Sequence, residues 1–314
     1  MKSMYPSCAN TFKQWCQTNK IYNNFFLTLN KPSIFDVTLR DGLQALSKKE
    51  QREITTLDKI KIYKNLVTNY SPQHIEIGSI VSGKVLPIFS DTLQFLDQIN
   101  NHDRENNVLN EKYVLIPSRE KLKEVINNNY INCFSFITST SNNFQLKNTK
   151  KTLSESDSDL YEMLYDLENK KDKTIVKIYV SCINECPIDG KIDNDFIVHR
   201  LLKIHNMNID LICLSDTCGS LNPDDFEYII DTCKVFGLPM SKVSLHLHVK
   251  PERESIVEQI IWMALDRKIV NFDVSNLKSG GCSVTMNKTQ LAPNLSYELY
   301  YQALSKYIIK KTNY

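Results

Sequence analysis

The chain is organised around one stretch near its beginning, Phe35-Asp36-Val37-Thr38-Leu39-Arg40-Asp41-Gly42-Leu43-Gln44. The stretch opens with the pattern of a short strand and ends in an Arg-Asp-Gly turn. A cation and a carboxylate stand side by side at this turn, and we expect Gly42 to let the backbone turn tightly after them. The stretch therefore predicts a strand that delivers two charged side chains at its carboxyl end.

The rest of the chain alternates between strand-like and helix-like stretches. Strict alternation predicts a parallel sheet, and eight strand–helix units in 314 residues favour a closed (β/α)8 TIM barrel as a single domain. No G-x-G-x-x-G motif follows the first strand, which counts against a dinucleotide-binding sheet. The predicted strands are Ser33–Thr38, His74–Ile77, Lys112–Ile116, Ile131–Thr138, Thr174–Cys182, Ile209–Leu214, Val243–His248 and Ile269–Val274.

The helices are predicted between these strands, and residues 1–30 are expected to be an extension that precedes the barrel domain of residues 31–314. The polar segment Ser139–Asp159 has the composition of a long surface loop with one short helix. The last helix is predicted over Asn294–Ile309, after a loop over Ser275–Pro293. The other predicted helices are Glu50–Tyr70, Val85–Ile99, a helix that begins at Pro117-Ser118, Leu160–Glu168, Asp195–Asn206, Pro223–Phe236 (with Asn222 as N-cap) and Glu252–Asp266.

Composition excludes several classes of protein. Hydrophobic residues make up 42% and charged residues 24%, which is typical of a globular protein with a substantial core. A net charge of +2 gives no case for nucleic acid or an acidic membrane surface, and no apolar run is long enough to span a bilayer. Nine cysteines, an odd number, favour reduced thiols, and the first thirty residues lack a secretory or mitochondrial signal. We therefore expect a cytosolic protein with no nucleic-acid or membrane partner.

Polar residues follow the predicted strands at their carboxyl ends, where the active sites of barrel enzymes lie. Asp41 follows the first strand, and His246 and His248 end the seventh. Side chains alternate across a strand, so the two histidines face the same way. One carboxylate and two imidazoles suit a divalent metal ion. Because the first, seventh and eighth strands adjoin when the barrel closes, we expect these three residues to meet.

Further candidates lie at the same end of the barrel. Glu76 ends the second strand, where it could hold Arg40 and the metal ligands in place, and Cys282 follows Gly280-Gly281 as a candidate acid or base. Each group also has a purely structural explanation. Arg40-Asp41 alone would be a surface ion pair, the histidines satisfied core residues, and Cys282 an inert thiol. Their predicted convergence at one barrel mouth favours a site.

At this point the sequence resembles the 3-hydroxy-3-methylglutaryl-CoA lyases, within the wider group of metal-dependent barrel lyases and Claisen-type synthases. The resemblance covers roughly residues 33 to 300, and the order and spacing of its motifs make it specific. The matching motifs are Arg40-Asp41-Gly42-Leu43-Gln44, Ile75 to Ser82, Phe144 with Lys147-Asn148 and Glu155-Ser156, Ser181-Cys182 to Cys186-Pro187 with Gly190-Lys191-Ile192, Asp216-Thr217 with Gly219, His246-x-His248 and Gly280-Gly281-Cys282.

The resemblance implies a carbon–carbon lyase that cleaves a 3-hydroxy-acyl-CoA to acetyl-CoA and a keto acid. Asp41, His246 and His248 would hold Mg2+ or Mn2+, and Arg40 would stabilise the developing oxyanion. Cys282 would help to transfer a proton from a loop that covers the site. The partners implied are an acyl-CoA or oxo-acid substrate, and a homodimer is an open alternative to a monomer.

The sequence departs from the lyase pattern in the loops after His248 and Cys282. Val249-Lys250-Pro251 replaces an acidic residue and a Thr-Tyr-Gly turn, and the loop over 283–290 is shorter and has no glycine. A fourth metal ligand could be Asn287, Gln290 or a water molecule. These departures keep two alternatives open: an aldolase or Claisen-type synthase acting on another 2-oxo or 3-hydroxy acid, and a catalytically silent barrel used for binding.

Overall fold

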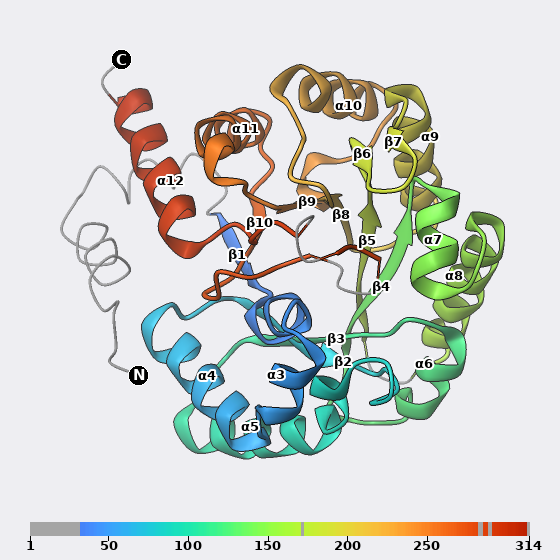
Figure 1. Cartoon of the computed structure of the whole chain (residues 1–314), viewed down its shortest axis with the longest axis vertical. Coiled ribbons are helices and arrows are strands. Elements are labelled where there is room, and N and C mark those ends of the chain that lie inside the picture. Colours follow the sequence, from blue (N-terminus) through green and yellow to red (C-terminus); the bar gives the residue numbers. More distant parts are fainter. Residues whose placement is uncertain (1–31, 171–172, 282–284, 288–290, 313–314) are drawn as a thin grey trace.

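Eight parallel strands close into a barrel in the computed structural model, which describes residues 32–170, 173–281, 285–287 and 291–312 (Figure 1). The order around the barrel is β1-β10-β9-β8-β5-β4-β3-β2, so the first and last barrel strands pair. The predicted TIM barrel is confirmed; the predicted extension, residues 1–30, lies outside the described residues. The barrel strands are β1 (Ser33–Asp36), β2 (His74–Ser79), β3 (Glu111–Leu115), β4 (Cys133–Ser139), β5 (Ile175–Ser181), β8 (Leu211–Asp216), β9 (Val243–Leu247) and β10 (Asn271–Val274).

Helices surround the barrel and form its outer layer (Figure 1). The predicted cap Asn222 accepts a hydrogen bond from the backbone of Asp225 and starts its helix as expected. A short hairpin, β6 (Glu185–Cys186) with β7 (Gly190–Lys191), follows β5. The helices are α3 (Lys48–Glu53), α4 (Thr56–Asn69), α5 (Thr92–Asn106), α6 (Arg119–Val125), α7 (Asn142–Thr149), α8 (Leu153–Glu168), α9 (Asn194–His205), α10 (Pro223–Val235), α11 (Glu254–Asp266) and α12 (Tyr297–Thr312).

The segment Ser139–Asp159, expected as a long surface loop with one short helix, is mostly helical, because it forms α7 and most of the first half of α8. The side chain of Ser141 caps α7, and Thr152 forms a reciprocal capping box with Glu155 at the start of α8. These capping side chains accept hydrogen bonds from backbone amides in the first helical turn, which would otherwise bond to water. Polar composition indicated exposure here, while the capping residues decided the local structure.

Two other predicted helix boundaries are displaced, one of them by capping. The helix predicted over Glu50–Tyr70 is two helices, since Thr55 caps α4 after an extended residue, Ile54, ends α3. The helix predicted from Val85 begins only at Thr92, after the 3-10 turn η2 (Pro87–Phe89).

The main apolar core lies between the strands and the helices, where alternate strand residues such as Ile178 and Val180 face outward and are fully buried. The other face of the strands fills the barrel interior. At one level this interior is aromatic, with Phe35 and Tyr113 in contact. Beyond that level it becomes polar and leads to the carboxyl ends of the strands. The fold therefore brings polar side chains from several strands into one enclosed volume.

The chain returns to the barrel mouth before its last helix. The predicted start of that helix at Asn294 is wrong, because α12 begins at Tyr297 and Asn294 forms an antiparallel bridge with His248. A second bridge joins Ser275 to Ser296. No helix among the described residues is both long and apolar enough to cross a membrane.

Candidate metal and active site

A buried π-helical turn, η1 (Thr38–Gly42), follows β1 and positions Arg40 and Asp41. The amides of Arg40 and Gly42 both donate to the carbonyl of Val37, at 3.2 and 3.1 Å, which holds the turn against the end of the strand. We expected Gly42 to let the backbone turn tightly after Arg40 and Asp41, and this reason is wrong. Gly42 lies inside the helical turn itself. A Cβ there would meet Ser275 Oγ at 3.1 Å, so the glycine allows close approach to the segment after β10.

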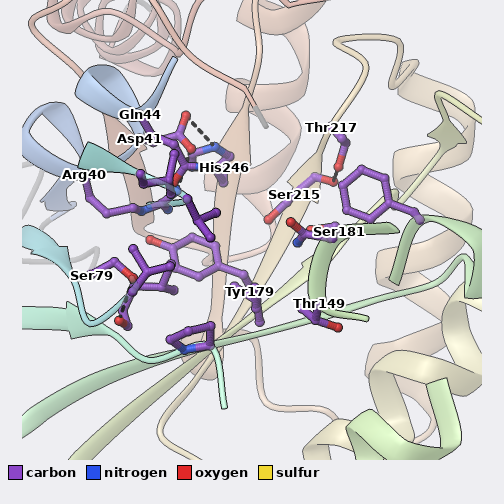
Figure 2. Close-up of a pocket in the computed structure, with 18 of the residues that line it drawn as sticks. Arg40, Asp41, Gln44, Ser79, Thr149, Tyr179, Ser181, Ser215, Thr217 and His246 are labelled. Atoms are coloured by element: carbon purple, nitrogen blue, oxygen red, sulfur yellow. Dashed lines mark hydrogen bonds and ion pairs between the residues drawn. The ribbon is translucent and has the colours of Figure 1, made fainter. Parts of the chain in front are cut away.

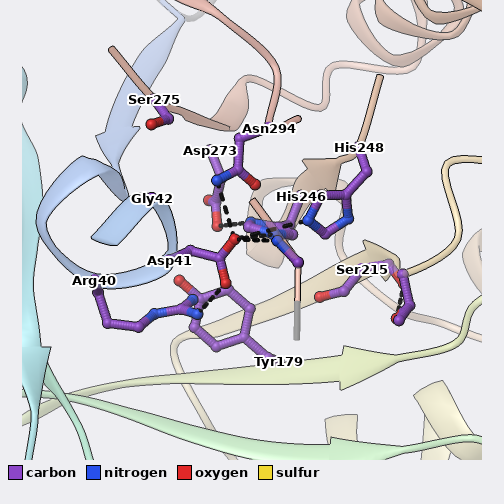
Figure 3. A network of polar contacts seen from close by, with 12 residues as sticks. Arg40, Asp41, Gly42, Tyr179, Ser215, His246, His248, Asp273, Ser275 and Asn294 are labelled. Atoms are coloured by element: carbon purple, nitrogen blue, oxygen red, sulfur yellow. Dashed lines mark hydrogen bonds and ion pairs between the residues drawn. The ribbon is translucent and has the colours of Figure 1, made fainter. Parts of the chain in front are cut away.

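Asp41, His246 and His248 lie together at the mouth of the barrel (Figure 3). Asp41 Oδ2 is 3.9 Å from His246 Nε2 and 3.7 Å from His248 Nε2. One potential ligand atom from each residue lies within 4.8 Å of the others. All three residues are buried, each only 4% exposed. This spacing leaves room for one cation between a carboxylate oxygen and two imidazole nitrogens.

Hydrogen bonds to the other ring nitrogens fix both histidines. His246 Nδ1 lies 3.1 Å from Asp273 Oδ2, and His248 Nδ1 lies 2.9 Å from the carbonyl oxygen of Asp216. Both partners are acceptors, so Nδ1 carries the proton in each ring. The neutral rings then present the lone pairs of Nε2 toward Asp41, which is the arrangement that a metal-binding histidine needs.

Asn294 belongs to the same cluster, although the sequence did not single it out. Its Nδ2 donates to Asp41 Oδ2 at 3.0 Å and to the carbonyl of Ser279 at 3.1 Å. Asn294 Oδ1 and His248 Nε2 are both buried without a hydrogen-bond partner among the described residues. Buried polar atoms are normally satisfied, so these two atoms and the Asp41 carboxylate fit a bound cation. These donor atoms therefore fit a divalent metal ion that takes oxygen and imidazole ligands.

The fourth-ligand candidates named from the sequence are placed differently. Asn287 is exposed, and Gln290 lies outside the described residues. Asn294 was assigned to the start of a helix, but its bridge with His248 carries it into the site. The available signal was an asparagine at the end of the loop that follows Gly280-Gly281 on the active face.

Two adjacent glycines let the loop after β10 close over Asp41. A Cβ at Gly280 would lie 2.6 Å from Asn294 Cγ, so only glycine leaves room for that side chain. Gly281 has a left-handed backbone (φ +95°) and donates its amide to Asp41 Oδ2 at 3.0 Å. The Gly280-Gly281 pair therefore lets both Asn294 and the Gly281 amide reach the Asp41 carboxylate. Cys282, the candidate acid or base that follows, lies outside the described residues.

Arg40 is held on three sides and lines the pocket. Its Nη1 donates to Asp41 Oδ1 at 2.5 Å and its Nε donates to Glu76 Oε2. The Arg40 guanidinium also lies 5.0 Å from the centre of the Tyr179 ring, and the Tyr179 hydroxyl donates to Glu76 Oε2 at 3.0 Å. Glu76 is fully buried and orients Arg40. Burial opposes charge here, yet Glu76 and Asp41 raise the pKa of Arg40 well above its usual value.

The ionisation of the cluster follows from burial and these contacts. Burial alone would raise the pKa of Asp41, but the charge of Arg40 and the two neighbouring histidines hold it well below its usual range. Burial lowers the pKa of His246 despite its hydrogen bond to Asp273. Burial also acts to lower the pKa of His248, but Asp41 and the Asp216 carbonyl outweigh it and raise that pKa. Asp41 is thus anionic over the whole neutral range.

The cluster opens into a pocket with about 840 Å³ of space, part of it open to solvent (Figure 2). Gln44, Ser79, Thr217 and other polar side chains face this space beside Arg40 and the histidines. A second part of the wall is apolar. Its side chains are Val81, Val85, Leu86, Leu115, Pro117, Ile137 and Phe144.

The chain matches the family model described as HMGL-like over residues 31–250, which is well over half of its length. The chain belongs to this family. Membership supports an enzyme of the lyase kind, and the matched region contains β1 to β9 with Asp41 and both histidines.

Individual relatives of this HMGL-like protein are distant. The mitochondrial hydroxymethylglutaryl-CoA lyase of Arabidopsis thaliana is 25% identical over 282 residues, covering 90% of this chain and 57% of the relative. The chain thus spans little more than half of that relative. A 3-hydroxy-3-isohexenylglutaryl-CoA/hydroxymethylglutaryl-CoA lyase of Pseudomonas aeruginosa is 23% identical, covering 82% of this chain and 81% of the relative. The crystal structure of the HMG-CoA lyase from Brucella melitensis shares the fold, with a TM-score of 0.74, 23% identity, and coverage of 88% and 90%.

Proposed function

We propose that this HMGL-like protein is a divalent-metal-dependent carbon–carbon lyase that cleaves a 3-hydroxy-3-methylglutaryl-CoA-type thioester to acetyl-CoA and a keto acid. The observation that carries the proposal is the buried approach of Asp41 to His246 and His248 beside the Arg40 guanidinium. The names of the distant relatives supply the reaction class. We propose Mg2+ or Mn2+ as the ion, because the ligands are hard oxygen and imidazole donors.

The proposed ligands are Asp41, His246 and His248, with Asn294 as the fourth protein ligand. When bound there, the cation would supply Lewis acidity to the hydroxyl and carbonyl oxygens of the substrate. The remaining contribution comes from side chains of this chain. They bind the substrate, hold it against the cluster and balance the charge that develops as the carbon–carbon bond breaks.

Arg40 would stabilise the oxyanion that forms on the acyl fragment. Its guanidinium is fixed by Glu76 and Asp41, so little reorganisation is needed when negative charge appears in the pocket. Glu76 keeps the Arg40 guanidinium in place, and we assign it no other role. Cys282 is proposed to move a proton, on the resemblance alone.

The two alternatives lead to different behaviour. A synthase or aldolase would use the same cluster with another 2-oxo or 3-hydroxy acid. A silent barrel has no need for a buried carboxylate facing two histidines whose ring nitrogens are already oriented. A cytosolic location and a homodimer stay predictions.

The test combines cation binding with turnover in matched variants. Isothermal titration with Mn2+ and turnover of hydroxymethylglutaryl-CoA are measured for wild type, Asp41→Ala and Arg40→Met. We expect wild type to bind Mn2+ and release acetoacetate, and Asp41→Ala to lose both properties. Arg40→Met should keep cation binding and lose turnover, because it removes the charge that faces the substrate and no ligand.

Specific outcomes would overturn the proposal. Normal turnover by Asp41→Ala would refute the metal role. Cation binding without any turnover of hydroxymethylglutaryl-CoA, but with turnover of another acid in a panel of 2-oxo and 3-hydroxy acids, would assign the synthase or aldolase alternative. Neither binding nor turnover by wild type would favour the silent barrel.

A further inference from the structure

Lys177 is a fully buried lysine inside the barrel, one level below the candidate active site. Alternate residues of a strand face the same side, so Lys177 on β5 points into the barrel like Tyr179 and Ser181. Tyr179 and Ser181 line the pocket, whereas Lys177 does not. Lys177 therefore cannot act on a substrate in the pocket directly, and its charge needs another explanation.

Within the described part of the chain, Lys177 contacts one carboxylate and two aromatic rings. Its Nζ donates to Asp273 Oδ1 at 2.5 Å, and both side chains are completely buried. The Lys177 ammonium also lies 3.3 Å from the centre of the Phe35 ring and 4.5 Å from that of Tyr179. Apolar side chains of similar volume would fill such a place without the desolvation that a buried ion pair requires. The pair is thus poorly explained by stability alone.

Asp273 connects Lys177 to the cation-binding cluster. Its Oδ1 faces Lys177, and its Oδ2 accepts from His246 Nδ1 at 3.1 Å. Cys213 Sγ also donates to Oδ2, at 3.6 Å. Figure 3 shows Asp273 beside His246, close to Asp41 and Asn294. One carboxylate therefore joins a lysine on β5 to a histidine on β9.

We infer that Lys177 is a positioning residue for His246: it holds the Asp273 carboxylate so that the His246 ring keeps Nε2 directed at the bound cation. This inference rests on the metal-binding role proposed above. The evidence is the geometry of the chain Lys177–Asp273–His246–Asp41, in which each link is buried and within contact distance.

The charges around His246 explain why a positively charged side chain is needed at position 177. Two carboxylates approach the same imidazole, Asp41 at Nε2 and Asp273 at Nδ1. Arg40 faces Asp41, and Lys177 is the cation that faces Asp273. Without Lys177 the Asp273 carboxylate would be buried and only weakly held, and it could rotate away from the ring. His246 would then lose the acceptor that fixes its orientation.

The experiment uses substitutions at Lys177 and a matched buried lysine. Lys177→Met removes the charge, and Lys177→Arg keeps it. Lys59→Met is the control, because Lys59 is also buried and pairs with Asp91 and the carbonyl of Ile88, but it lies on α4 outside the barrel. Mn2+ affinity is measured by isothermal titration, the coordination of Co2+ by its visible spectrum, and folding by thermal unfolding without metal.

We expect Lys177→Met to bind Mn2+ about 10- to 100-fold more weakly, the range for outer partners of metal ligands, and to change the Co2+ spectrum. Lys177→Arg should restore most of the affinity. Lys59→Met should lower the unfolding temperature and leave affinity and spectrum unchanged. If Lys177→Met does not fold, the double variant Lys177→Met/Asp273→Asn removes the unpaired charge, and it should fold and still bind Mn2+ more weakly than wild type.

Wild-type affinity and spectrum in Lys177→Met, or in the double variant where that is used, would overturn the inference and leave the metal site standing. An equal loss of affinity in Lys59→Met would also overturn it, because the effect would then reflect general destabilisation. If wild type itself binds no cation, this inference and the proposed function fail together.

Discussion

Replacing Asn294 with alanine should weaken cation binding and loosen the loop that closes over Asp41. The amide of Asn294 spans Asp41 Oδ2 at 3.0 Å and the Ser279 carbonyl at 3.1 Å. A hydrogen bond to a charged group and one to a neutral group together stabilise the fold by roughly 2–4 kcal/mol. The variant also loses the proposed oxygen ligand. Residues that only support metal ligands contribute about 10- to 100-fold to affinity, so we expect the Mn2+ affinity to fall by at least that much.

The assay separates these two effects. Chemical denaturation without metal gives the free energy of unfolding, and isothermal titration of the folded protein gives the Mn2+ affinity. Asn287→Ala is the matched control, because Asn287 is exposed and was an equal candidate on sequence alone. We expect the control to match wild type in both measurements.

Two results would refute the reasoning about Asn294. If Asn294→Ala binds Mn2+ as tightly as wild type, a water molecule or another residue completes the site. If Asn287→Ala loses as much affinity, the loop over residues 285–287 supplies the ligand and Asn294 only anchors the backbone.

Three further predictions follow from the structure. Gly280→Ala should weaken Mn2+ binding about 10-fold, since its Cβ would lie 2.6 Å from Asn294 Cγ and displace the proposed fourth ligand. Unchanged affinity by titration would contradict this. Glu76→Gln should lower turnover and leave Mn2+ affinity intact, because Glu76 contacts Arg40 and no proposed ligand; a parallel loss of affinity would argue against that division. Burial raises the pKa of Asp36 to about 7 from 3.8, so the folded state keeps a proton that the unfolded chain has lost. The free energy of unfolding of wild type relative to Asp36→Asn should therefore fall as pH rises from 5 to 7, by up to about 1.4 kcal/mol per pH unit, and level off above pH 8; a flat difference in denaturation experiments would refute the shifted pKa.

The barrel was predictable because its evidence is local. Each strand is a short apolar run such as Ile131–Thr138, and each helix has its own periodicity and caps, so their alternation can be read without knowing any contact. The errors arose where local signals compete. The segment Ser139–Asp159 is polar enough for a loop, but Ser141 and Thr152 cap two helices there. Composition describes how much of a segment faces water, whereas capping decides whether its backbone can satisfy itself.

The sequence by itself determined the repeated strand–helix order, and therefore the end of the barrel at which Asp41, His246 and His248 had to lie. It also determined that both histidines share one face of a strand, since that follows from the alternation of side chains. Only the tertiary structure decided that Asn294 joins them, because its bridge to His248 depends on how the last loop returns to the barrel. Lys177 became meaningful in the same way, since its partner Asp273 lies on a strand far along the chain and the two meet only inside the closed barrel. Contacts between distant segments depend on three-dimensional packing, and no local pattern in the chain encodes them.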